Sequence, residues 1–189
     1  MAEYYFDIET EGLDPSKDRL CTLQFQRLST EDGRPESELQ IWKVWEKGEE
    51  QIIKDFHEMF YADPVTEKPK LWGFVPIGEN LLFEFYFLGY KVQHYLKKEW
   101  SLQFIKEKPF LDVKYILIVM NYGRFTGFDA LLGKTREGPK VAQWCKEGKH
   151  KEIEEYVRGE AKRFIESYQV LKREIPKIKL PYAISRTGP

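Results

Sequence analysis

Two acidic residues stand near the start of the chain, in Asp7-Ile8-Glu9. The residues from Glu3 to Ile8 are aromatic and β-favouring, so we expect the pair at the end of a strand. Residues i and i+2 of a strand point to one face, so both carboxylates project together and repel each other unless a cation neutralises them. Oxygen ligands of this kind suit Mg²⁺ or Mn²⁺, and the alternative is a solvated pair at a strand end.

The residues around this pair form a longer motif. Phe6-Asp7-Ile8-Glu9-Thr10 is followed by Gly12-Leu13-Asp14-Pro15. This run resembles the first exonuclease motif of the DEDD superfamily of 3'–5' exonucleases, whose fold is ribonuclease H-like. The combination of a strand, an acid pair, Thr and a Gly-Leu turn in fixed order makes the motif fairly specific.

A second motif of that family, Asn-x-x-Phe-Asp-x-x-Phe-Leu, follows a strand and opens a helix. The segment Gly78–Leu88 resembles it at four positions and has Glu84 where the family has Asp; the four positions are Asn80, Phe83, Phe87 and Leu88. Glu keeps the charge but extends the carboxylate by one methylene, which would favour the less demanding Mn²⁺ or could mark a decayed site. Because the substitution conserves charge, we favour an active site.

The third motif, in the tyrosine branch of the family, is Tyr-x-x-x-Asp on a long helix near the carboxyl end. Tyr156-Val157-Arg158-Gly159-Glu160 resembles it, again with Glu for Asp. The histidine branch uses His-x4-Asp, and His150 with Glu155 has that spacing as an alternative. We favour the tyrosine register because Tyr156 and Glu160 lie one turn apart within an amphipathic helix, whereas His150 follows Gly148-Lys149 at the helix start.

The resemblance implies roles for nine residues. Two divalent ions, Mg²⁺ or Mn²⁺, would be held by Asp7, Glu9, Glu84 and Glu160, and Tyr156 would orient the attacking water. The turn after the acid pair would meet the terminal nucleotide through Thr10 and Leu13. Asn80 and Phe83 would support the second motif and line the substrate pocket.

The implied activity is removal of nucleotides from the 3' end of single-stranded DNA. The alternatives are an RNA 3'-end trimming enzyme and a catalytically weak nucleic-acid-binding or scaffold module of the same fold. Single-stranded nucleic acid, DNA rather than RNA, is therefore the expected partner. A homo-oligomer is also possible, and exposure of Trp42, Trp45 and Trp100 would favour it.

Composition limits the other classes of protein. The chain has 189 residues, with 30 Lys and Arg against 31 Asp and Glu and a net charge of -1. No apolar run predicts a membrane span, and Cys21 and Cys145 form neither a CxxC pair nor a disulfide framework, which favours a reducing cytoplasm. The balanced charge argues against a nucleic-acid partner. Two bound divalent ions would, however, change the charge to about +3 and make the attraction for phosphate local.

The elements that must position these residues follow from periodicity. We expect an antiparallel meander, then helices alternating with a buried strand, giving an α/β fold with a ribonuclease H-like mixed β-sheet flanked by helices. The predicted strands are Glu3–Ile8, Leu20–Leu28, Leu39–Trp45 and Leu71–Ile77, the last of them ending near Pro76; the predicted helices are Glu49–Phe60, Asn80–Leu96, Asp112–Met120 and His150–Ile175. A Gly-rich loop at 123–138, with a helical turn at 128–132, connects the last two helices. Residues 1–175 would form the exonuclease domain and 176–189 a basic tail.

Overall fold

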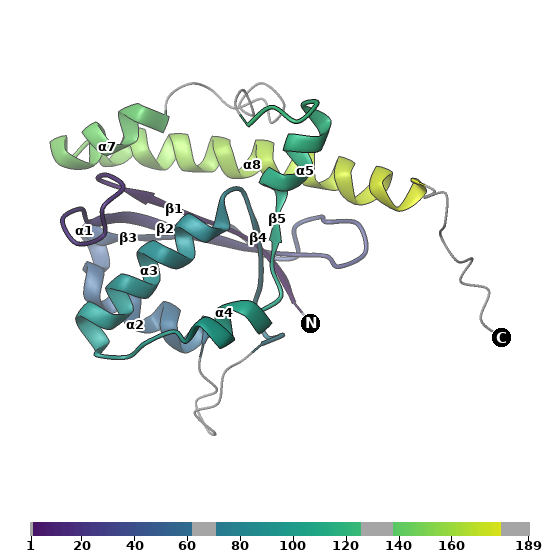
Figure 1. The fold of residues 1–189 in the computed structure, drawn as a ribbon. Coiled ribbons are helices and arrows are strands. Elements are labelled where there is room, and N and C mark those ends of the chain that lie inside the picture. The colour runs from purple at the N-terminus through teal and green to yellow at the C-terminus, as the bar shows by residue number, and fades with distance from the viewer. Residues whose placement is uncertain (1, 62–70, 126–137, 179–189) are drawn as a thin grey trace.

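Five strands form one mixed sheet in the order β3-β2-β1-β4-β5 (Figure 1). The computed structural model describes residues 2–61, 71–125 and 138–178. The strands are β1 Glu3–Thr10, β2 Leu20–Leu28, β3 Gln40–Lys43, β4 Val75–Gly78 and β5 Leu111–Asp112. The first three pair antiparallel, and β4 pairs parallel with both β1 and β5. This arrangement confirms the predicted meander extended by parallel strands.

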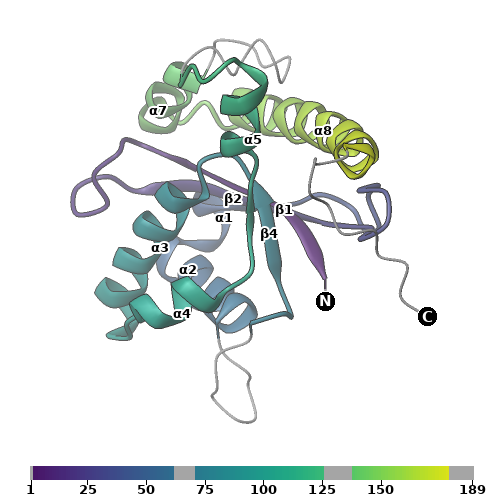
Figure 2. The same ribbon diagram turned by 45° about the vertical axis from the view of Figure 1, so that its right-hand side comes forward.

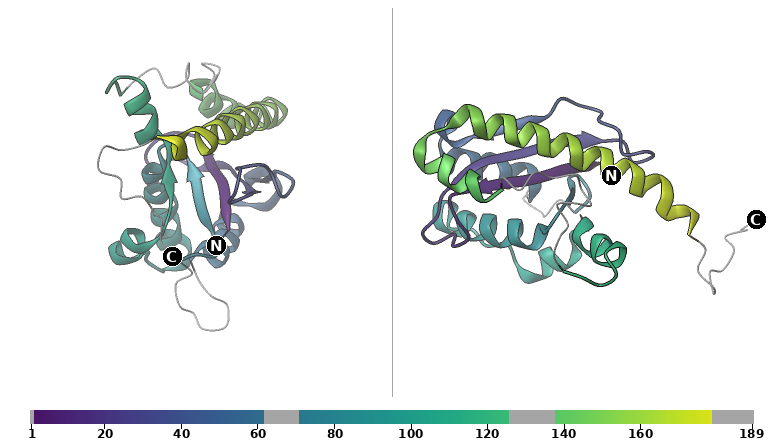
Figure 3. Two further views of the ribbon diagram at one scale, coloured as in Figure 1. Left: turned by 90° about the vertical axis from the view of Figure 1, so that its right-hand side faces the viewer. Right: turned by 90° about the horizontal axis from the view of Figure 1, so that it is seen from above.

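Helices cover both faces of the sheet (Figure 2). On one face lie α2 Glu49–Phe60, α3 Leu81–Leu96 and α4 Leu102–Glu107; on the other lie α5 Val113–Met120, α7 Gly138–Glu147 and α8 His150–Glu174. The one-turn helix α1 Val44–Lys47 links β3 to α2, and the 3-10 helix η1 Ile175–Lys177 follows α8. Seen from above, α8 extends across the sheet over the purple N-terminal strands (Figure 3).

The pleat of β1 divides the core into two layers. Phe6 and Ile8 pack into the cluster formed with α2, α3 and α4, and the ring of Phe6 stacks on Phe56 at 5.0 Å. Tyr5 points the other way, into the cluster under α5 and α8. Because side chains alternate along a strand, Asp7 and Glu9 share the face of Tyr5. The sheet therefore presents both carboxylates to α8.

Some predicted boundaries were wrong. The third strand ends at Lys43, because the chain turns through α1 to reach Gly48, which has a φ of +79°. The strand expected from Leu71 begins at Val75 and continues through Pro76, so the proline stands near the start of β4. Helices α4 and α7 were not predicted. The helical turn expected at 128–132 and most of the basic tail, residues 179–189, lie outside the described residues.

The three tryptophans whose exposure would favour self-association do not form an exposed group. Trp100 is buried against the core, and Trp42 and Trp45 are half-buried. Trp100 Nε1 donates a hydrogen bond of 3.0 Å to Nδ1 of the buried His57. An acceptor nitrogen requires a neutral imidazole, and burial lowers the pKa of His57 from 6.5 to about 4.

This histidine predicts acid sensitivity of the fold. In the unfolded chain His57 is protonated below pH 6.5, whereas in the folded protein it is protonated only below about pH 4. The contribution of His57 is therefore complete above pH 6.5 and is lost as the pH falls towards about 4. Urea unfolding at pH 7.5 and 4.5 should show a larger loss of unfolding free energy for wild type than for His57→Gln, whose amide oxygen still accepts from Trp100. Equal losses would contradict this assignment.

Candidate active site

Three carboxylates meet where the end of β1 faces α8. Asp7, Glu9 and Glu160 each offer an oxygen, and these oxygens lie within 4.8 Å of one another. Glu160 is buried, while Asp7 and Glu9 are half-buried. The strand contributes two ligands through its i, i+2 alternation, and the helix contributes the third from a position 153 residues later than Asp7 in the chain. Oxygen donors at this separation are a suitable set for a hard divalent cation.

Asp7 is oriented by side chains of its own sheet. Gln24 Nε2 donates a hydrogen bond of 2.9 Å to Asp7 Oδ2, and Thr22 Oγ1 donates one of 3.0 Å to Gln24 Oε1. Thr22 and Gln24 are fully buried. The hydroxyl of Tyr5 also donates to Asp7 Oδ2, at 3.4 Å. These hydrogen bonds hold the carboxylate of Asp7 in one orientation.

Sequence reasoning missed Tyr5 and Gln24. The alternation from Leu23 to Gln26 places Gln24 on a polar face of its strand, but its position opposite Asp7 depends on the strand register, which the structure shows. Burial raises the pKa of Tyr5 well above its usual value, and the negative charges of Asp7, Glu160 and Glu9 raise it further. Tyr5 is thus a neutral donor beneath the carboxylates.

Tyr156 lies close enough to Asp7, Glu9 and Glu160 for their negative charges to affect its pKa. Burial raises the pKa of its phenol far above 10, followed by the charges of Glu160 and Glu9 and by a hydrogen bond with Glu160. The ring is half-buried and contacts Trp144 of α7 edge-on, with 6.4 Å between ring centroids. The structure therefore brings Tyr156 and Glu160 together with the acid pair.

Glu84 is placed differently. It lies in the first turn of α3 and is 4 % exposed. Among the described residues, the group of carboxylates within 4.8 Å of one another comprises Asp7, Glu9 and Glu160, and Glu84 is outside it. The helix begins shortly after β4, which lies beside β1, so Glu84 follows the end of the strand next to the one that carries Asp7 and Glu9.

Asn80 supports the corner that carries Glu84 through both its backbone and its side chain. Asn80 has a φ of +65°, its N–H donates to Asp112 Oδ1 at 2.9 Å, and its Oδ1 accepts from Lys114 Nζ at 2.8 Å. These contacts join the β4–α3 corner to β5 and α5. Phe83 is half-buried against the core under α3, and its ring lies 5.9 Å from that of Phe87.

The other two predicted substrate residues follow the acid pair. Thr10 Oγ1 donates a hydrogen bond of 2.6 Å to the carbonyl of Gly12, which closes the turn at the end of β1. Leu13 is 77 % exposed at that turn. An exposed leucine in the turn that follows the acid pair is available for contact with an apolar surface such as a base.

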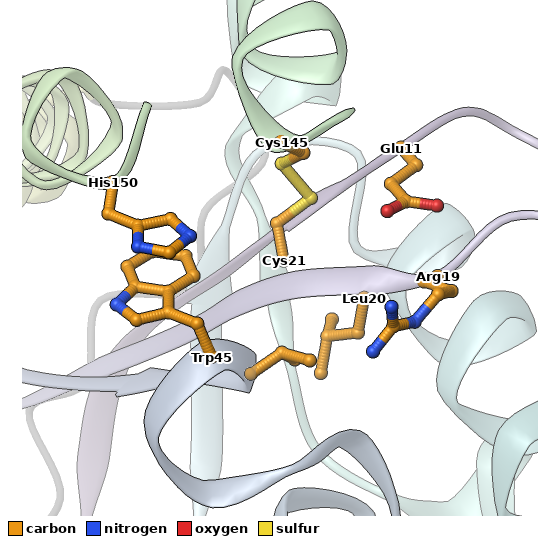
Figure 4. Close-up of a pocket in the computed structure, with 8 residues that line it drawn as sticks. Glu11, Arg19, Leu20, Cys21, Trp45, Cys145 and His150 are labelled. Atoms are coloured by element: carbon orange, nitrogen blue, oxygen red, sulfur yellow. A yellow bond between two sulfur atoms is a disulfide. The ribbon is translucent and has the colours of Figure 1, made fainter. Parts of the chain in front are cut away.

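His150, the alternative to Tyr156, has a different environment. Its ring stacks on Trp45 at 4.1 Å and lines a cavity of about 140 Å³ next to Cys21 and Cys145 (Figure 4). The hydroxyl of Tyr156, by contrast, bonds Glu160 of the candidate site. This contrast favours the tyrosine register.

The two cysteines form a disulfide, contrary to the expectation that they are unpaired. Cys21 of β2 and Cys145 of α7 have Cα atoms 6.1 Å apart, and the bond ties α7 to the sheet (Figure 4). A separation of 124 residues gives no signal of this contact in the sequence. This disulfide removes the basis for expecting a reducing compartment. Within the described ranges, no helix has the length and apolar character needed to span a membrane.

Comparison with known proteins gives a result for the fold. No protein-family model matches the chain, and no curated protein matches it. A structure of Exonuclease I determined in relation to its processivity matches with a TM-score of 0.59 and 13% identity over 93% of this chain and 42% of that one. The zinc-bound Escherichia coli Exonuclease I–single-stranded DNA complex matches with a TM-score of 0.59 and 12% identity, over 93% and 41%.

A third match is E. coli Exonuclease I with a dT13 oligonucleotide, with a TM-score of 0.59 and 13% identity over 93% of this chain and 41% of that one. The chain thus spans about two fifths of the length of these structures. At such identity the likeness concerns the fold. The expected fold class is confirmed: the chain has a ribonuclease H-like fold, similar to that of Exonuclease I.

Proposed function

We propose that this chain is a metal-dependent 3'–5' exonuclease that removes nucleotides from single-stranded DNA. The observation that carries the proposal is the group of Asp7, Glu9 and Glu160 beside Tyr156. Two supports are the motif resemblance to DEDD exonucleases and the similar fold of an E. coli enzyme whose structure contains single-stranded DNA.

The donor set fits divalent metal ions. Asp7, Glu9 and Glu160 would hold one ion, and Asp7 with Glu84 would serve a second. Bound ions would lower the pKa of a water molecule and stabilise the charge that develops on the leaving 3' oxygen. Oxygen donors of this kind suit Mg²⁺ or Mn²⁺, and a structural relative was solved with zinc.

The residues of the chain then have distinct tasks. Gln24 and Tyr5 keep the carboxylate of Asp7 in one orientation. Tyr156 remains a neutral phenol at physiological pH, because of its raised pKa, and orients the attacking water by a hydrogen bond. Leu13 and Thr10 meet the terminal nucleotide.

Asn80 and Phe83 have supporting roles in this proposal. The contacts of Asn80 with Asp112 and Lys114 hold the corner that positions Glu84, and Phe83 packs the first turn of α3 against the core. Residues 1–175 constitute the exonuclease domain, and 176–189 form a basic extension. Lys177, at the start of this extension, forms an ion pair with Glu174.

The test is cleavage of 5'-end-labelled oligonucleotides. Single-stranded DNA, duplex DNA and RNA are each incubated with the protein in Mg²⁺, Mn²⁺ or EDTA. We expect a ladder shortened from the 3' end of single-stranded DNA that EDTA abolishes. Trimming of RNA alone would support the RNA enzyme instead, and binding without cleavage in either metal would support a scaffold module.

The contact between Gln24 and Asp7 gives a graded prediction. Gln24→Leu removes the amide donor and should weaken Mn²⁺ binding by about 10- to 100-fold, which is the usual effect of removing a hydrogen-bond partner of a metal ligand. Calorimetric titration of Mn²⁺ measures this, with Gln26→Leu on the same strand as the control, because Gln26 Nε2 bonds the carbonyl of Ser37 instead. Equal affinities for the two variants would show that Gln24 does not position Asp7.

A further inference from the structure

The loop that joins β1 to β2 begins two residues after Glu9. In this Glu11–Arg19 loop, Glu11 N–H donates to the carbonyl of Arg19 at 2.9 Å, and Asp14 N–H donates to Asp18 Oδ2 at 2.9 Å. A Cβ added to Gly12 would lie 2.3 Å from Asp18 Oδ2, so the carboxylate of Asp18 fills the inside of the loop. Leu13 projects from this folded loop and is 77 % exposed.

A buried ion pair holds the far end of the loop. Glu49, the first residue of α2, accepts a hydrogen bond of 2.8 Å from the Leu20 N–H, and its Oε1 lies 3.1 Å from Lys91 Nζ of α3. Lys91 Nζ donates a hydrogen bond of 2.7 Å to the carbonyl of Asp18. Tyr95, one turn further along α3, donates to Glu49 Oε2 at 2.7 Å. We call Glu49, Lys91 and Tyr95 the loop anchor.

The loop anchor places charged groups in the interior, where they contribute little to the stability of the core. Glu49 and Lys91 are each 6 % exposed, and burial with the Glu49 contact raises the pKa of Tyr95 to about 12. Burying two charges costs desolvation that their attraction only partly offsets, so such pairs are weak evidence for stability. Lys91 bonds the carbonyl of Asp18 and Glu49 bonds the N–H of Leu20, so the pair holds the backbone on each side of Arg19. What it fixes is therefore the position of the loop relative to α2 and α3.

We propose that the loop anchor is a positioning device that holds Leu13 in place to receive the terminal nucleotide of a single strand. The proposal rests on the exonuclease function proposed above and adds residues to it that lie outside the three motifs. Lys91 and Glu49 do not touch the substrate. They act through the loop, and their loss should weaken substrate binding more than it slows chemistry.

The molecule contains a matched control at the other end of β1. Glu3 accepts hydrogen bonds from Tyr168 at 3.0 Å and from Lys172 Nζ at 2.6 Å, so the same three residue types form a second network, in which Lys172 is half-buried whereas Lys91 is buried. Glu3 is the first residue of β1, and the network joins it to α8. Lys172→Met therefore removes a lysine contact with the same two residue types at the opposite end of the strand from the carboxylates.

The experiment compares Lys91→Met with Lys172→Met, each in the wild-type and in the Leu13→Ala background. Initial rates on labelled single-stranded DNA in Mn²⁺ give KM and kcat. Lys91→Met should raise KM about three- to tenfold, the effect of one or two lost hydrogen bonds, and change kcat by less than about twofold. Lys172→Met should leave KM unchanged. Because Lys91 acts through Leu13, adding Lys91→Met to Leu13→Ala should raise KM no further.

Amide hydrogen exchange provides a second readout that does not need activity. Exchange in residues 11–20 should accelerate in Lys91→Met and not in Lys172→Met. If Lys91→Met misfolds, Tyr95→Phe removes a single hydroxyl and should shift KM and exchange in the same direction. If the wild type cleaves but Lys91→Met and Lys172→Met have the same KM and exchange, the positioning role alone is overturned. The same holds if Lys91→Met raises KM as much in the Leu13→Ala background as in the wild-type background. A wild type that cleaves no strand would overturn the proposed function and this role with it.

Discussion

Asp7→Asn should lower the rate of cleavage of single-stranded DNA by about a thousandfold or more. Asp7 is the ligand proposed to serve both ions, and metal stabilisation of a phosphoryl transition state is worth several kcal/mol. The amide keeps the shape of the side chain but removes the charge that the ions require. Rates measured in saturating Mn²⁺ on a labelled oligonucleotide test this expectation.

The stability of the same variant separates a lost site from a lost fold. Neutralising one of three neighbouring carboxylates relieves repulsion, so the metal-free Tm of Asp7→Asn should not fall below that of wild type. Asp32→Asn, in the exposed turn after β2, is the control and should keep full activity. An active Asp7→Asn protein would exclude the proposed role of this carboxylate.

Tyr156→Phe should reduce kcat by about a hundredfold with little change in KM. The phenol is proposed to orient the attacking water, and a positioned proton donor or acceptor contributes about 10² or more to a rate. The matched comparison is His150→Ala, which removes the competing histidine and should cost little, because its ring stacks on Trp45. A near-complete loss of rate from the histidine change alone would reverse the assignment.

The pKa of Tyr156 also predicts its effect at alkaline pH. The folded protein keeps the phenolic proton well above pH 10, whereas the unfolded chain releases it near pH 10. Stability from this group is therefore complete below pH 10 and is lost as the pH rises further. The unfolding free energy of wild type should fall more steeply between pH 9 and 11 than that of Tyr156→Phe.

Much of this architecture was predictable because it follows local periodicity. The helix Glu49–Phe60 has the bounds that its apolar spacing predicts, and α8 ends one residue before its predicted end. The alternation in β1 predicted that Asp7 and Glu9 share a face, and the structure places them there with Glu160. Where the pattern continued past a turn, as from Lys43 to Trp45, the prediction extended the strand too far.

What the sequence could not provide depends on contacts between distant segments. The register that sets Gln24 opposite Asp7, the bond between Cys21 and Cys145, and the contact of Lys91 with Asp18 all join elements whose approach is decided by packing. Glu84 is the residue for which motif and geometry agree least. It is buried at the expected helix start, but outside the group of three carboxylates.

The most direct test of the candidate site is a calorimetric titration of Mn²⁺ into the wild-type protein and into Asp7→Asn, without nucleic acid. If Asp7, Glu9 and Glu160 hold a divalent cation, wild type gives a saturable binding isotherm and Asp7→Asn gives none at the same concentrations. No binding by wild type, or the same isotherm for both proteins, would contradict the proposal that these carboxylates form a metal centre.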